Sequence, residues 1–113
     1  MKYILSWMVL VSLSTSSLYP TSWAKTFGGT NGDGARSICE ISDSGSIVTG
    51  GTRSFGAGNS DFLVIKLNSS GNIQWAKTFG GTNDDIALSI CETSDNGYII
   101  AGGTTSFLSL IHI

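Results

Sequence analysis

Three features of this sequence predict an all-β fold built from repeated units. The segment Trp23 to Phe55 returns as Trp75 to Phe107 at a constant offset of 52 residues, with 24 of the 33 aligned positions identical. Short runs of β-branched and aromatic residues alternate with Gly, Asn and Asp, which indicates strands and turns. Within the repeats no stretch keeps the apolar periodicity of a helix. A repeat of this length marks units that bury a core only by packing against one another.

The length of the chain suits one small domain, but the repeat indicates a larger protein. The second copy ends about two-thirds of the way through a period, so we expect a fragment that is incomplete at both ends. Charged residues make up 12% of the sequence and the net charge is -2. With so few charges and no basic stripe, we expect no nucleic-acid partner.

Residues 1–22 differ in character from the repeats and predict a signal peptide. Lys2 precedes the mostly apolar stretch Tyr3–Leu13, and a polar run follows. A stretch of this length is too short to cross a bilayer, but it fits the hydrophobic region of a secretory signal. We therefore expect a secreted or cell-surface protein, although the cleavage position is not defined. The alternative is an N-terminal strand or core helix.

Four stretches in the first period have the composition of strands, and they follow one another in the order Ser37–Ser42, Ser46–Thr52, Phe62–Leu67 and Asn72–Phe79. The turn sequence Asp43-Ser44-Gly45 predicts that the first two form a hairpin. The third stretch is apolar on both alternation faces, which predicts a strand covered on both sides. The fourth alternates in polarity, as expected for a half-exposed outer strand.

Four strands in about 50 residues, joined by hairpins, are typical of a β-propeller blade. On this count residues 37–79 form one complete four-stranded antiparallel blade. Residues 23–36 supply the last strand of a preceding blade, at 23–27, and a loop. Residues 80–107 begin the next blade, with its first two strands within 89–104. The chain would thus hold about one and a half blades. A β-solenoid is the main alternative, but its coils are usually shorter.

The motifs WAKTFGG, Asp-x-Ala-x-Ser-Ile and SFGAGNSDFLVIKLNSSGNIQWAKTFGG give the chain a recognisable likeness. It resembles the bacterial and archaeal β-propeller repeat family of the SBBP type, found in secreted and cell-surface proteins. The likeness covers Trp23 to Phe107. It implies repeated four-stranded blades in large exported proteins and no common catalytic residue. Cys39 and Cys91 depart from it, because the family more often has a polar residue at their position.

The end of the chain departs from the repeat abruptly. The first copy continues with Gly56-Ala57-Gly58, whereas the second continues with residues 108–113, LSLIHI. The same six residues are encoded in one frame by CTGTCTCTTATACACATC, the mosaic-end adapter of transposase-based sequencing libraries. We therefore predict that residues 108–113 are an adapter-derived, non-native tail. A divergent apolar terminus is the alternative, and different codons in the underlying nucleotides would establish it.

The sequence predicts no catalytic, cofactor-binding or metal-binding residue, and no cofactor. The one histidine, His112, lies in the suspect tail, so the rest of the chain offers no histidine base, triad or zinc site. The loop at 28–34 lacks the Lys-Ser/Thr of a phosphate loop and the ligand spacing of an EF-hand. We interpret Asp33 and its copy Asp85 as turn-capping carboxylates that accept backbone N–H bonds. Calcium binding by this loop is the alternative.

Three other pairs of residues have structural interpretations. Asp84 and Asp85 read as solvated loop acids rather than an acid–base pair. Lys25 and Lys77 lie beside Trp23 and Trp75 and would discourage edge pairing, with a glycan-binding Trp–Lys surface as the alternative. Cys39 and Cys91 are expected to be separate, half-buried thiols rather than a disulfide, although the sequence does not establish that they are free.

Two functions fit this sequence. The first is an exported, non-catalytic binding or display scaffold at the cell surface. Its partners would be an extracellular protein or glycan, not identified by the sequence, and the missing blades of the same chain. The alternative is the N-terminal part of a secreted propeller enzyme acting on polysaccharides, with its catalytic residues on missing blades. No catalytic constellation is visible, so the sequence favours the scaffold.

Overall fold

The computed structural model describes residues 9–13, 22–105 and 110–113, with side chains described from Ser22 to Thr105 and from Ile111 to Ile113. The fold of these residues is all-β, as predicted, and contains no helix that could cross a membrane. The strands are β1 (Val9–Leu13), β2 (Ser22–Thr26), β3 (Asp33–Glu40), β4 (Ser46–Thr52), β5 (Asp61–Leu67), β6 (Ile73–Phe79), β7 (Asp85–Glu92), β8 (Tyr98–Thr104) and β9 (Leu110–His112).

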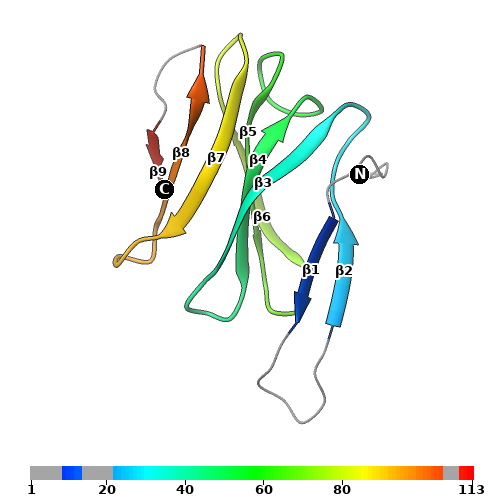
Figure 1. Ribbon diagram of the computed structural model, residues 1–113, viewed down its shortest axis with the longest axis vertical. Helices are drawn as coiled ribbons and strands as arrows, with labels where there is room; N and C mark the ends of the chain where they lie inside the picture. Colours follow the sequence, from blue (N-terminus) through cyan, green and yellow to red (C-terminus); the bar gives the residue numbers. More distant parts are fainter. Residues whose placement is uncertain (1–8, 14–21, 106–109) are drawn as a thin grey trace.

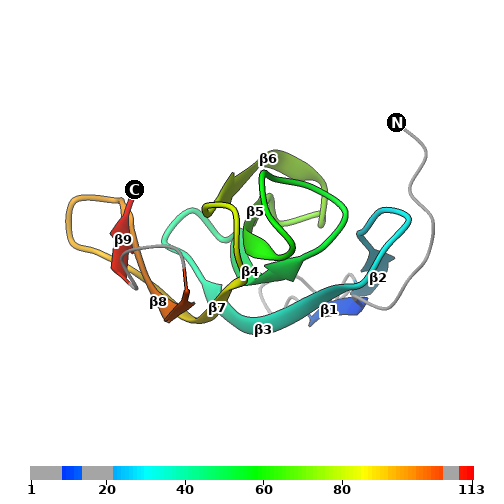
Figure 2. The same cartoon turned by 90° about the horizontal axis from the view of Figure 1, so that it is seen from above.

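The strands form three antiparallel sheets that lie side by side. A four-stranded sheet of order β3-β4-β5-β6 lies between the β1-β2 pair and the sheet β7-β8-β9 (Figures 1 and 2). Each strand of the central sheet pairs with its neighbour in sequence, so the sheet is a meander. This confirms the predicted four-stranded antiparallel unit, and the described strands form no closed sheet.

The first strand of each repeat is longer than the sequence predicted. β3 begins at Asp33 rather than Ser37, because Asp33 pairs with Thr52 and Gly34 pairs with Gly51. β7 likewise begins at Asp85. The glycines of this segment suggested a loop, whereas here they allow close approach: a Cβ at Gly50 would overlap the carbonyl oxygen of Gly34.

A β-bulge interrupts the pairing of β3 with β4. Ala35 pairs with Gly50 and Ser37 pairs with Thr49, so Arg36 is the extra residue. β7 carries the same irregularity between Ala87 and Ser89. A bulge bends its strand and changes the direction of the extra side chain. Both copies therefore keep the bulge, which sets the direction of one side chain in each.

The central sheet is covered on both faces. Six of the seven residues of β5 are buried, as expected for Phe62–Leu67, and β4 shows the same pattern. On the side of the third sheet, side chains from both sheets form one buried cluster: Ile41, Ile47, Phe62, Val64, Ala87, Ile90, Tyr98 and Ile100. The opposite face is a cluster of Phe27, Val48, Leu63, Ile65 and Leu67. Burial of apolar area on both faces joins the sheets.

The WAKTF segment has the same role in both copies. Trp23 packs against the cluster that contains Phe27, and Trp75 and Phe79 pack against the cluster between the second and third sheets. Each copy thus covers the sheet that follows it in sequence. Elsewhere β6 is mostly exposed, which confirms that it is an outer strand.

Both ends of the chain pair with neighbouring strands. Part of the predicted signal segment forms β1, which pairs with β2, while residues 1–8 and 14–21 lie outside the described residues. At the other end β9 pairs with β8, although residues 106–109 are again outside the description. Neither pairing tests export or the origin of the tail, so both stay predictions.

Removing the Phe62 side chain is expected to destabilise the fold strongly. Phe62 is 1% exposed in the cluster between two sheets, and Phe62→Ala is expected to lower the free energy of unfolding by about 3–5 kcal/mol. Ile38, which is 49% exposed, serves as the control, and Ile38→Ala should change it by no more than about 0.5 kcal/mol. Urea unfolding followed by tryptophan fluorescence measures both, and equal losses would contradict the stacked arrangement.

Candidate functional site

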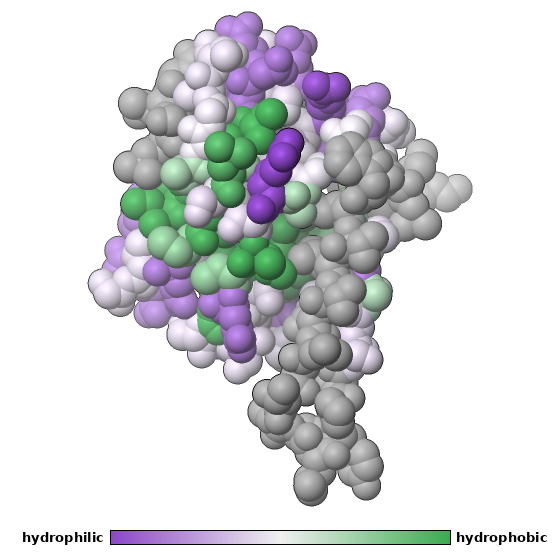
Figure 3. Space-filling view, in the orientation of Figure 1, coloured by the Kyte–Doolittle hydropathy of each residue, from purple (hydrophilic) through white to green (hydrophobic). Residues whose placement is uncertain are grey.

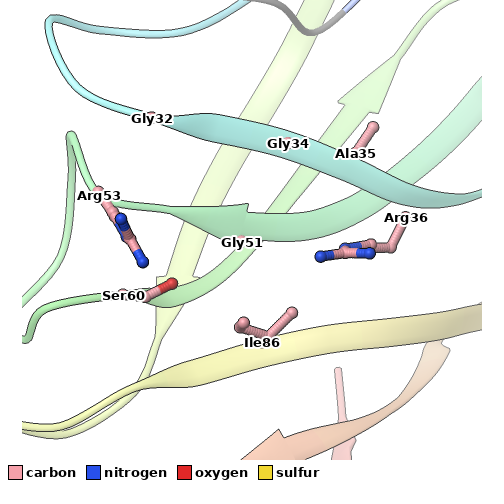
Figure 4. Close-up of a pocket in the computed structure, with 8 residues that line it drawn as sticks. All are labelled: Gly32, Gly34, Ala35, Arg36, Gly51, Arg53, Ser60 and Ile86. Atoms are coloured by element: carbon pink, nitrogen blue, oxygen red, sulfur yellow. The ribbon is translucent and has the colours of Figure 1, made fainter.

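A pocket of about 450 Å³ lies where the central sheet meets β7. It is lined by Gly32, Gly34, Ala35, Arg36, Gly51, Arg53, Ser60 and Ile86 (Figure 4). The space-filling view shows apolar side chains gathered across this face of the molecule, with hydrophilic ones among them (Figure 3). The volume lies within the range of ~300–1,000 Å³ that is usual for small-molecule sites.

The pocket contains the only two arginines of the sequence, Arg36 and Arg53. Both guanidinium groups point into the space between β4 and β7 (Figure 4). The ion pairs among the described residues join Lys66 to Asp43 and His112 to Asp95, so neither arginine belongs to one. Two unpaired forks of N–H donors in one recess can accept a negatively charged group.

The β-bulge positions Arg36. Its backbone is the extra residue of β3, so its side chain does not follow the simple alternation of the strand. The equivalent residue on the bulge of β7 is Leu88, which is 56% exposed. The bulge therefore presents the side chain in both copies, and only the first copy places a charge there.

A buried carboxylate positions Arg53. Asp33 accepts hydrogen bonds from the hydroxyls of Thr52 and Ser54, the second at 2.7 Å, so both neighbours of Arg53 are held. The backbone N–H of Arg53 also donates to the carbonyl of Gly32 at 2.9 Å. The backbone that carries Arg53 is thereby tied to the start of β3.

The environment of Asp33 confirms its predicted turn-capping role. The backbone N–H of Gly29 donates to its carboxylate at 2.8 Å. Burial by itself would raise the pKa of Asp33, but the hydrogen bonds from Gly29, Thr52 and Ser54 outweigh it and lower the pKa below the ordinary value of 3.8. The side chain is therefore a buried carboxylate ion at neutral pH.

The second copy repeats this arrangement around Asp85. The backbone N–H of Gly81 donates to its carboxylate at 2.9 Å, and Thr104 donates from its hydroxyl. Asp85 is 1% exposed, so the interpretation of a solvated loop acid is wrong for this residue. The reason is that β7 begins at Asp85 and buries it, whereas Asp84 precedes the strand and is exposed, as expected.

Ser60, directly before β5, and Ile86, in β7, line the pocket where the central and third sheets meet. The backbone N–H of Asp85 donates to the carbonyl of Ser60 at 2.7 Å, which joins the two sheets at this point. A Cβ at Gly51 would lie 3.4 Å from the Ser60 hydroxyl oxygen and 3.6 Å from Ile86. The glycine therefore leaves the space between these two side chains open.

Several of the positions where the two copies differ line the pocket. Nine of the 33 aligned pairs differ, and four of the nine first-copy residues line it: Gly32, Gly34, Arg36 and Arg53. The second copy has Asp84, Ile86, Leu88 and Thr105 at these places. The sequence alone did not single out the arginines, although comparing the copies for charge differences would have done so.

The residues singled out for other roles lie away from this pocket. Lys77 Nζ lies 5.0 Å from the centre of the Trp75 ring, and Lys25 Nζ bonds to the Asn72 side chain at 2.5 Å. Neither lysine lines the pocket with the arginines. A smaller apolar recess of about 230 Å³ lies beside Lys77, between Phe27 and the central sheet.

Both cysteines carry free thiols. Cys39 is half-buried against the cluster between the sheets, as expected, but Cys91 is exposed and that part of the expectation is wrong. The difference arises because Cys39 packs against this cluster and Cys91 does not. Within the described residues, no three His, Cys, Asp or Glu side chains are grouped as metal ligands.

Comparison with protein-family models, with curated proteins and with solved structures gives no match for this chain. The likeness to SBBP-type repeats therefore rests on the sequence motifs and stays a prediction.

Removing the charge of Asp33 is expected to destabilise the fold in a pH-dependent way. Asp33→Asn keeps the volume but loses charge-assisted hydrogen bonds, so the free energy of unfolding at pH 7 should fall by ~1–3 kcal/mol. Because folding lowers the pKa of Asp33, its stabilisation is present above the unfolded pKa and is lost as pH falls through the folded pKa. The difference between the native chain and the variant should therefore narrow below pH 3.8.

Urea unfolding between pH 2 and pH 7 measures this difference. The matched control is Asp84→Asn, because Asp84 is exposed and lies one residue before the equivalent Asp85. A constant difference across the pH range would contradict an ionised, hydrogen-bonded Asp33.

Proposed function

We propose that this chain is part of an exported β-propeller repeat protein of the SBBP type that acts as a non-catalytic binding or display scaffold at the cell surface. Two observations support the proposal. Antiparallel sheets of two, four and three strands follow one another along the chain and pack side by side, as propeller blades do. The motifs shared by the two copies resemble those of SBBP-type repeats.

The pocket supports a binding function because residues that differ between the two copies line it. The residues common to both copies build strands, turns and buried carboxylates, whereas four of the residues that differ line one recess. A uniform frame with local variation is how repeat proteins present a specific site.

The lining of the pocket favours binding over catalysis. Its charged side chains are two arginines, whose guanidinium groups donate hydrogen bonds and accept none. Polysaccharide cleavage usually needs a pair of carboxyl groups that flank the bond, and no carboxyl group lines this pocket. An enzyme that carries its catalytic residues on other blades is the alternative proposal.

A panel of polysaccharides distinguishes the two proposals. We expect the chain to co-sediment with at least one insoluble polysaccharide, because the pocket is open and contains unpaired donors, and to release no reducing ends from it. The matched control is the double variant Arg36→Leu and Arg53→Thr, whose substituents are those of the second copy. Release of reducing ends by the native chain would contradict a non-catalytic role, and no co-sedimentation with any member would contradict glycan binding.

Export is tested separately. Residues 1–22 fused to alkaline phosphatase without its own signal should give activity in the bacterial periplasm, because the enzyme is active only after translocation. Replacing Val9 and Val11 by Asp should abolish the activity by interrupting the apolar region. If the fusion with the native residues 1–22 shows no phosphatase activity, export is contradicted.

A further inference from the structure

We propose that Arg36 and Arg53 together bind the carboxylate of an acidic sugar, whose ring lies against Ile86. This inference deepens the proposed binding function and rests on it, because it names the ligand class of the same pocket. Its basis is the juxtaposition of two unpaired guanidinium groups, one hydroxyl and one aliphatic wall around a recess of about 450 Å³.

Electrostatics is the first argument for a negatively charged ligand. Both guanidinium groups point into one space, and no described carboxylate forms an ion pair with either. Like charges that share a recess repel one another, and a bound anion replaces this repulsion with two attractions. The nearby carboxylate of Asp33 is occupied by hydrogen bonds from Thr52, Ser54 and Gly29 and does not line the pocket.

The shape of the donors favours a carboxylate. A guanidinium group is planar and presents its N–H donors as a fork that matches the two oxygens of a carboxylate. Arg36 is aimed by a bulge and Arg53 by a locked turn, so the backbone under each fork is held before a ligand arrives. Such preorganisation reduces the entropy lost on binding.

The remaining lining favours a sugar as the body of the ligand. Gly32, Gly34 and Gly51 leave backbone groups without covering side chains, and Ser60 adds a hydroxyl. These groups suit the hydroxyls of a sugar ring, while Ile86 offers an aliphatic surface to its C–H face.

The second copy shows that the frame does not require the arginines. It has Leu88 in place of Arg36 and Thr105 in place of Arg53, and it keeps the same bulge and the same buried aspartate. Two exposed cations near one another are therefore not needed to build a repeat. Their placement is explained by a ligand of opposite charge.

Calorimetric titration of the full chain tests this ligand class. The probe is galacturonate, with galactose as the uncharged sugar and inorganic sulfate as the sugar-free anion. Galacturonate is expected to bind at least about tenfold more tightly than either, because only it engages both the guanidinium forks and the wall of the pocket. Equal binding of galactose would overturn the role of the arginines, and equal binding of sulfate would overturn the role of the sugar ring.

Variants assign the binding to the two arginines. Arg36→Leu and Arg53→Thr are each expected to weaken galacturonate binding by about tenfold or more. Urea unfolding of each variant checks that the fold is retained, which the second copy leads us to expect. The charge control is Lys77→Gln on the outer strand β6, which removes one positive charge outside the pocket and should change the affinity by less than about twofold.

Lysine variants separate specific recognition from general attraction. Arg36→Lys and Arg53→Lys keep the charge but lose the planar fork, so they should weaken binding nearly as much as Arg36→Leu and Arg53→Thr. Native affinity in the lysine variants would overturn carboxylate recognition by the forks. If galacturonate does not bind while the chain still co-sediments with a polysaccharide, the ligand class is overturned and the scaffold function stands.

Discussion

The buried carboxylate of Asp33 is the interaction on which the first repeat and its pocket depend. It lies at the start of β3 and accepts hydrogen bonds from Gly29 in the loop before it, from Thr52 at the end of the paired strand, and from Ser54 just beyond that strand. A buried charge is tolerated only when such donors surround it, so the carboxylate holds three segments in one arrangement. Arg53 lies between two of its donors and is positioned as a consequence.

The pocket also requires the packing of one sheet against the next. The apolar face of the central sheet toward β7 and β8 includes Ile47, Phe62 and Val64, and it brings Ile86 of the second copy near the arginines of the first. A pocket between repeats is thus a property of the junction and not of either repeat alone. This explains how a regular frame carries a local site: the stack needs an apolar core between its sheets, and the residues around the recess are free to differ.

The charged residues also divide between those that build the frame and those that line the pocket. The carboxylates of Asp33 and Asp85 are buried and bonded in corresponding ways, because each belongs to the frame. The guanidinium groups are exposed, belong to no ion pair among the described residues, and occur in one copy only. A group that stabilises a fold is expected to have partners within it, whereas a charged group without partners in a recess is available to a ligand.

The sequence by itself determined the repeat, the all-β class, the four strands of the central sheet and the capping role of Asp33, because turn residues, alternation and identity between copies are local signals. It did not show that β3 starts at Asp33, because Gly32 and Gly34 favour a loop in the sequence and only the pairing with β4 makes this segment a strand. Only the tertiary structure decided the pocket. A one-residue bulge changes which face a side chain occupies, and the packing of the third sheet then places Ile86 beside Arg36 and Arg53 in one pocket.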